Sequence, residues 1–126
     1  SVVLDTDVLI WFLRGNRKAA ALIESLEERC LSVINYMELV RGARSRRELL
    51  KLKELLGRID AVVLPLSENI GHRAAIYIEE YGLKSGLGLA DALIAATAIE
   101  NRLPLCTANK KHYVAVKDLD LKAFRP

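Results

Sequence analysis

Short apolar runs without alternating polar residues recur along this chain, and they limit its fold more than any other feature. The runs cover residues 1–4, 30–33, 61–66 and 105–107, and a fifth candidate covers 119–123. Helical patterns separate them. Strands that are apolar on both faces are typical of parallel sheets with helices on either side. We therefore predict an α/β fold, a three-layer α/β/α domain whose central, mainly parallel sheet has four to five strands.

Capping residues and the spacing of apolar side chains predict the helices between these strands. Counted with their caps, the expected helices cover residues 8–13, 16–29, 35–42, 45–59, 67–81 and 89–102. The expected N-caps are Asn16, Asn35, Ser45 and Ser67. A breaker region over residues 82–88 is expected to end the fifth helix.

Length and composition favour one soluble globular domain. The chain has 126 residues, of which 52% are hydrophobic and 28% charged. Its longest uncharged stretches, such as residues 92–99, fall well short of the ~20 apolar residues that cross a bilayer. We expect no membrane span, no signal peptide and a cytoplasmic location. Cys30 and Cys106 lie in apolar runs, so we expect them to be reduced, buried thiols.

The formal net charge of +3 permits a nucleic-acid partner without requiring one. Basic residues gather in one segment, at positions 41, 44, 46 and 47, followed by 51 and 53. Such a run either contacts phosphate groups or forms the solvated face of an amphipathic helix. Both interpretations remain open for Arg46 and Arg47.

Acidic residues follow the predicted strands or begin the helices beside them. Asp5, with Thr6 and Asp7, follows the first strand; Glu38 lies one turn into the helix after the second; Thr107 and Asn109 follow the fourth. In parallel sheets the strand ends meet at one edge, where ligands bind. Each residue alone is equally explained as a helix or turn cap.

Asp91 makes the capping explanation insufficient for the whole set. Eight uncharged residues, 92–99, follow it, so its helix is expected to be buried and its charge to need a partner or a cation. Several carboxylates at one edge also repel one another unless a cation lies between them. Oxygen ligands, with no His or Cys at ligand spacing, favour Mg²⁺ or Mn²⁺ over zinc. The chain has no phosphate-binding glycine motif and no nucleophilic-serine motif.

Four segments together resemble a known family. They are LDTDVLI at 4–10, YMELVRGA at 36–43, GLADALIAATA at 88–98 and CTANKKHY at 106–113. In this order and spacing they resemble a PIN domain, specifically the VapC toxin branch of type II toxin–antitoxin systems. The resemblance implies a single PIN domain over residues 1–126. It also implies a metal-dependent endoribonuclease that hydrolyses RNA phosphodiester bonds as the toxin of a VapBC pair.

The resemblance also implies roles for individual residues. Asp5 and Asp91 would bind Mg²⁺ directly, with Mn²⁺ as a substitute, and Glu38 would bind it directly or through water. Thr6 and Thr107 would orient these carboxylates. Asn109 would complete the catalytic set, at a position where other members carry Asp.

The partners implied by the resemblance are RNA, an antitoxin and a second copy of the chain. RNA phosphates would contact Arg14, Arg41, Arg44 and Lys110, although Arg41 could instead pair with Glu38. A VapB-like antitoxin would lie over the first helices and the groove of the active site. A homodimer is expected, with Tyr77, Ile78 and Tyr81 as candidate contacts or, alternatively, plain core.

Three other functions remain as alternatives. Asp5 and Asp7 resemble the nucleophile and acid/base pair of haloacid-dehalogenase-type phosphatases, but such a site also needs a lysine and a further acidic pair. A PIN-like module that binds RNA or acts as a scaffold without catalysis is a second alternative. A housekeeping PIN nuclease without an antitoxin is the third.

Overall fold

The computed structural model describes residues 1–126 and contains one five-stranded sheet with all strands parallel. The strand order is β3-β2-β1-β4-β5, so β1 lies at the centre. The strands are β1 (Val2–Leu4), β2 (Arg29–Ser32), β3 (Val62–Leu64), β4 (Leu105–Thr107) and β5 (Leu121–Ala123). The predicted parallel sheet is confirmed, and the fifth candidate strand is present at one edge.

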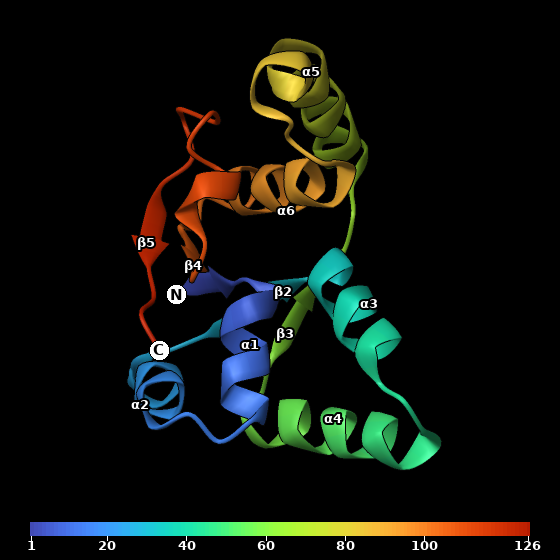
Figure 1. Ribbon diagram of the computed structural model, residues 1–126, viewed down its shortest axis with the longest axis vertical. Coiled ribbons are helices and arrows are strands. Elements are labelled where there is room, and N and C mark those ends of the chain that lie inside the picture. The colour runs from blue at the N-terminus through green and yellow to red at the C-terminus, as the bar shows by residue number, and fades with distance from the viewer.

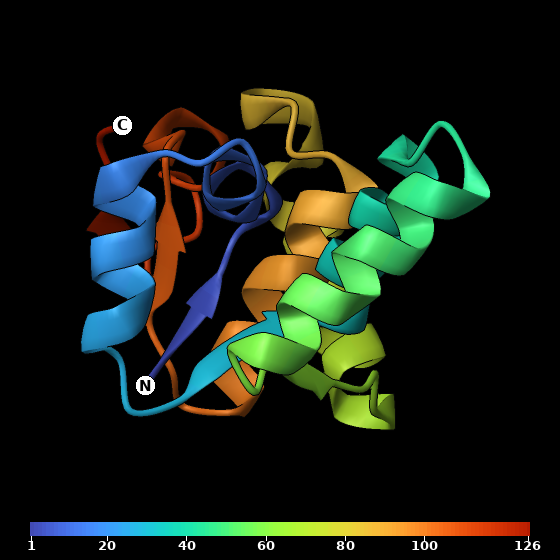
Figure 2. The same cartoon turned by 90° about the horizontal axis from the view of Figure 1, so that it is seen from below.

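Six α-helices flank the sheet. They are α1 (Thr6–Leu13), α2 (Arg17–Ser25), α3 (Val33–Gly42), α4 (Arg46–Arg58), α5 (Glu68–Ser85) and α6 (Leu89–Glu100), with a short 3₁₀ helix η1 (Lys110–His112) after β4. In Figure 1, α5 and α6 lie above the sheet, and α1, α2 and α4 lie below it. Figure 2 shows α1 between α2 and α4 on the lower face. The predicted three-layer α/β/α arrangement is confirmed.

Alternate residues of β1 enter two separate hydrophobic cores. Val3 packs into the cluster formed with α5 and α6, while Val2 and Leu4 pack into the cluster formed with α1, α2 and α4. The predicted burial of the Ala-rich helix is confirmed, because α6 lies between the sheet and α5. Its small side chains, among them Ala92 and Ala96, are completely buried and allow both neighbours to approach closely.

Several helix ends differ from the prediction. α1 begins at Thr6 rather than at residue 8, because the side chain of Asp5 caps it. α2 ends at Ser25 rather than extending to 29, and Arg29 begins β2. α3 is capped by Ser32, not by Asn35, and Asn35 completes a capping box by accepting a hydrogen bond from the Ser32 backbone N–H.

The fifth helix is longer than predicted. α5 continues through Gly82 and ends at Ser85, where Gly86 adopts a left-handed conformation with φ of 69°. The additional turn is exposed at residues 83–85, and the Gly86 N–H closes it by donating to the Gly82 carbonyl at 3.1 Å. Tyr77, named as a candidate dimer residue, is 4% exposed and belongs to the core. The core interpretation is therefore the correct one for Tyr77.

Two further observations concern the whole chain. No helix combines the length and the apolar character needed to cross a membrane. Cys30 and Cys106 are both buried and unpaired, which confirms the prediction of free core thiols. Burial raises the pKa of both thiols, that of Cys106 to about 11, with the nearby charges of Asp7 and Asp5 contributing. Neither thiol is therefore an activated nucleophile.

Candidate active site

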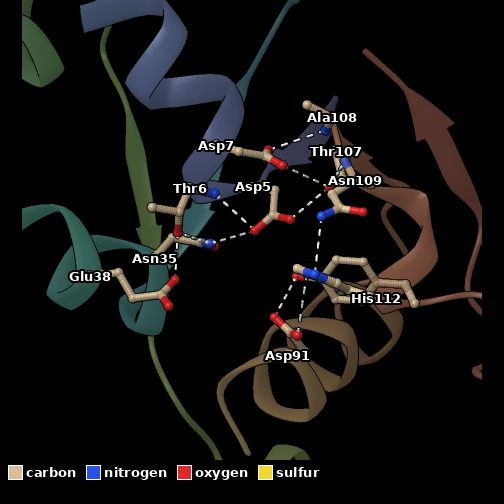
Figure 3. Close-up of polar contacts among 11 residues, drawn as sticks. Asp5, Thr6, Asp7, Asn35, Glu38, Asp91, Thr107, Ala108, Asn109 and His112 are labelled. Carbon is tan, nitrogen blue, oxygen red and sulfur yellow. Dashed lines mark hydrogen bonds and ion pairs between the residues drawn. The ribbon is translucent and has the colours of Figure 1, made fainter. Parts of the chain in front are cut away.

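Three central strands end at the same edge of the sheet, and polar residues follow each of them. Asp5 follows β1, Ser32 ends β2 and caps α3, and Thr107 ends β4. Asp5 and Thr107 are 7% and 0% exposed, so their polar groups meet away from bulk water. In Figure 3, Glu38 lies to the lower left of Asp5 and Asp91 lies below it. The structure therefore brings the three predicted metal ligands to one region.

Asp5 is held by hydrogen bonds at both carboxylate oxygens. Its Oδ1 accepts from the Thr6 backbone N–H at 2.9 Å and from Asn35 Nδ2 at 3.2 Å. Its Oδ2 accepts from Thr107 Oγ1 at 2.8 Å. Asp5 is thus both a helix cap and a fixed carboxylate of the site, and the two interpretations of the sequence are compatible.

Burial raises the pKa of Asp5 to about 6. The negative charge of Asp7 raises it further, while the hydrogen bonds from Thr107 and from the Thr6 backbone oppose the increase. At neutral pH the carboxylate is ionised at an energetic cost, because it has lost water and has an acidic neighbour. A cation beside Asp5 would remove much of that cost.

Glu38 is tied to the same network through Thr6. Thr6 Oγ1 donates to Glu38 Oε1 at 2.6 Å and accepts from Asn35 Nδ2 at 2.9 Å. Glu38 is not the glutamate that closes a capping box, because Asn35 occupies that role. Its carboxylate is exposed at the end of this chain of hydrogen bonds. The predicted role of Thr6 in orienting Glu38 fits this contact.

Asp91 lies in the first turn of α6 and has the partners that its isolation predicts. Tyr113 Oη donates to Asp91 Oδ1 at 3.2 Å, and His112 Nδ1 lies 3.7 Å from Asp91 Oδ2. Burial, followed by the negative charges of Asp5 and Asp91, raises the pKa of Tyr113 far above its ordinary value of 10. The Tyr113 hydroxyl therefore remains protonated and acts as a donor to Asp91.

Asn109 and Asp7 complete the polar edge. Asn109 Nδ2 lies 3.0 Å from His112 Nε2, and the Asn109 N–H donates to Thr107 Oγ1 at 3.1 Å. Asp7 Oδ1 accepts from the Ala108 N–H at 3.2 Å. Asp7 thus anchors the loop after β4 to the start of α1.

Two residues of the network have no predicted site role. Asn35 was expected only as a cap, and it bridges Asp5 and Thr6 from a completely buried position. Tyr113 ends the fourth quoted segment, and its side chain reaches Asp91. The sequence offers no signal for these contacts, because they depend on the relative placement of β1, α3 and the loop after β4.

The donor atoms fit a hard divalent cation in type, since carboxylate and amide oxygens surround this edge. As arranged, no three His, Cys, Asp or Glu side chains are close enough together to hold one ion. Glu38 is held by Thr6 and Asp91 by Tyr113. Ion binding at this edge therefore has to be accompanied by rotation of at least one carboxylate, such as that of the exposed Glu38.

An open groove of about 500 Å³ lies beside Glu38, between α1, α3 and α4. Half of its lining is apolar, from residues such as Leu39 and Leu52, and the remainder includes Arg14, Arg44 and Lys51. Two of the four predicted RNA contacts, Arg14 and Arg44, thus line one groove. The other two, Arg41 and Lys110, are exposed outside its lining. Arg41 forms no ion pair with Glu38.

Comparison with known proteins yields one family and several relatives. The model of the PIN domain matches residues 2–118. The chain is 30% identical to Ribonuclease VapC1 of Methanocaldococcus jannaschii, over 98% of this chain and 86% of that protein. It is 34% identical to Ribonuclease VapC10 of Mycobacterium tuberculosis, over 94% of this chain and 90% of that protein. A solved toxin-antitoxin complex from Klebsiella pneumoniae contains a chain with a TM-score of 0.79 and 29% identity, covering 94% of this chain and 95% of that one.

Proposed function

Because the chain belongs to the PIN-domain family and is homologous to VapC proteins, we propose that it is a metal-dependent endoribonuclease and the toxin of a VapBC-type pair. One observation carries the proposal. Asp5, Glu38 and Asp91 come from three different elements and gather at the carboxyl edge of the sheet. Residues 1–126 then form one PIN domain that works on RNA in the cytoplasm.

The carboxylates of Asp5, Glu38 and Asp91 would hold Mg²⁺, with Mn²⁺ as a substitute. When bound, the ion activates water, polarises the scissile phosphoryl group and offsets the charge of the leaving oxygen. Thr107 and Thr6 keep the carboxylates of Asp5 and Glu38 in place through their hydroxyl donors.

Asn109 is the remaining proposed catalytic residue. Its amide lies beside His112, which in turn lies beside Asp91, so it is placed next to the proposed ligands without contacting Asp5. A neutral amide adds no negative charge to this edge. The metal-free site therefore suffers less repulsion than it would with a fourth carboxylate.

Basic residues at two places near the carboxylates would bind the RNA backbone. Arg14 and Arg44 line the groove beside Glu38, and Lys110 begins η1 beside Asn109. Arg41 lies on α3, one turn after Glu38. Phosphate contacts of this kind position RNA without reading its sequence.

The groove between α1, α3 and α4 also suits a protein partner. Its mixture of leucines with charges of both signs fits an amphipathic segment of a VapB-like antitoxin. Such a segment would cover Arg14 and Arg44 and so exclude RNA. A homodimer through α5 is part of the proposal, because Ile76 and Leu83 on that helix are exposed and apolar.

The function is tested by comparing wild type, Asp91→Asn and a control, Asp120→Asn, which changes an exposed carboxylate on the loop before β5. Mn²⁺ binding is measured by calorimetry, and cleavage is measured on total cellular RNA with Mg²⁺ or Mn²⁺. We expect wild type and Asp120→Asn to bind the ion and produce discrete fragments, and Asp91→Asn to do neither. If the wild-type chain, free of any partner, binds no metal and cuts no RNA, the acidic residues are structural and the protein is a binding module.

A further inference from the structure

Tyr113 is completely buried, although it directly follows the exposed residues of η1. Its ring belongs to the hydrophobic cluster that includes Leu87, Ala92 and Val116. Its backbone N–H donates to the Lys110 carbonyl at 2.9 Å and closes the turn. The ring thereby anchors the loop after β4 against the start of α6.

The hydroxyl of this buried ring contacts the carboxylate of one proposed metal ligand. It donates to Asp91 Oδ1 at 3.2 Å. Thr107 and Asn35 contact Asp5 but not Asp91, and His112 contacts Asp91 from an exposed position. Tyr113 is therefore the buried donor to Asp91, as Thr107 and Asn35 are the buried donors to Asp5.

Packing alone does not explain this hydroxyl. A phenylalanine would fill the same apolar space, whereas a buried hydroxyl is costly unless it has a hydrogen-bond partner. Here its hydrogen-bond partner is the carboxylate of Asp91. The hydroxyl therefore forms its interaction at the polar edge and not in the hydrophobic core.

We propose that Tyr113 is a positioning residue of the metal site, whose hydroxyl fixes the Asp91 carboxylate at the polar edge, where Asp91 and Asp5 would bind one divalent cation. The inference rests on the proposed function, since it requires that these carboxylates bind a metal. Residues that orient metal ligands commonly change metal affinity by about tenfold to a hundredfold when they are altered.

The matched pair for testing this inference is Tyr113→Phe and Tyr77→Phe. Tyr77 is also buried, and its hydroxyl also interacts with a carboxylate at 3.2 Å, that of Asp118, which is not one of the proposed metal ligands. Each variant loses one buried hydroxyl, so both report the same kind of structural cost. We expect Tyr113→Phe to bind Mn²⁺ about tenfold or more weakly, and Tyr77→Phe to bind it as wild type does.

Cleavage assays separate positioning from a general structural defect. We expect high Mn²⁺ to restore the activity of Tyr113→Phe, with an unchanged KM for RNA, because the ligands themselves remain. Asp91→Asn should not be restored. A variant that is merely unfolded would lose RNA binding as well.

A spectroscopic measurement on the wild-type chain does not depend on the folding of Tyr113→Phe. Mg²⁺ should change the near-ultraviolet absorbance of tyrosine over the concentration range in which it binds, and Tyr77→Phe should keep this signal. No absorbance change, or a metal affinity of Tyr113→Phe within about threefold of wild type, would overturn the inference while leaving the metal site intact. Absence of Mn²⁺ binding by wild type would overturn both this inference and the proposed function.

Discussion

Replacing Asp5 by asparagine should make the metal-free protein more stable at neutral pH. Asp5 is 7% exposed, and burial together with the charge of Asp7 raises its pKa from 3.8 to about 6. Asparagine carries no charge and can keep the contacts. Its Oδ1 would accept from Thr6 and Asn35, and its Nδ2 would donate to Thr107, whose hydroxyl has Asp7 as a second acceptor at 3.4 Å.

The magnitude follows from the raised pKa. An increase from 3.8 to about 6 corresponds to roughly 3 kcal/mol of folding free energy. The folded chain binds this proton more tightly than the unfolded chain does. The stabilising effect of the protonated group is therefore complete below about pH 4 and is lost as the pH rises through about 6. Allowing for imperfect hydrogen bonds of the new amide, we expect Asp5→Asn to gain about 1–3 kcal/mol above pH 7.

Urea denaturation in the presence of a chelator provides the measurement, with Asp120→Asn as the control for loss of an exposed carboxylate. The gain of Asp5→Asn over wild type should shrink as the pH falls toward about 4.5. Added Mg²⁺ should stabilise wild type and leave Asp5→Asn unchanged. If Asp5→Asn is less stable than wild type above pH 7 without metal, the energetic cost assigned to the buried charge is wrong.

Four other substitutions test separate parts of the structure. Gly82→Ala should raise the free energy of unfolding by up to about 1 kcal/mol, because Gly82 is inside α5 and a Cβ there meets only Ile78 Cγ2 at 3.5 Å. Gly86→Ala should lower the free energy of unfolding by about 1–2 kcal/mol, because the φ of Gly86 is positive. Equal effects in denaturant titrations would contradict the observed end of α5. Asn35→Ala should lower the free energy of unfolding by roughly 2–3 kcal/mol, since it removes half of a capping box and two contacts to the site. A decrease below about 1 kcal/mol would be inconsistent with that network. Arg44→Glu should weaken RNA binding and reduce the slope of log affinity against log salt by about 1, whereas an unchanged slope would place Arg44 outside the RNA path.

The sequence predicts the architecture well because the apolar runs are both short and continuous. Such a pattern allows few arrangements other than a covered parallel sheet, and the five strands appear where the runs lie. The isolated charge of Asp91 in an apolar helix predicts a partner, and Tyr113 and His112 provide it. Both predictions succeed because they depend on local composition. The apolar runs determine the strands, and the composition of α6 determines its burial.

The local ends of helices and the details of the network are less predictable. Ser32 and Asn35 are both good caps, and the extended conformation of Ser32 at the end of β2 decides between them. Gly82 is a helix breaker by composition, yet α5 continues past it to Ser85 and ends at Gly86, which adopts a left-handed conformation. The contact of Tyr113 with Asp91 depends on how tightly the loop after β4 folds against α6, which no local pattern encodes.

The central position of β1 makes the timing of synthesis important. β1 pairs with β2 and β4, and the hydrogen bond from Thr107 to Asp5 joins residues 102 positions apart. Topologies that depend on contacts this distant in sequence fold more slowly than those built from local contacts. A chain still emerging from the ribosome carries Asp5, Glu38 and Asp91 but cannot form the hydrogen bond from Thr107 that fixes Asp5 until residue 107 has emerged. Under the proposed function, incomplete chains are therefore expected to leave the RNA around them intact, including the messenger that is being read.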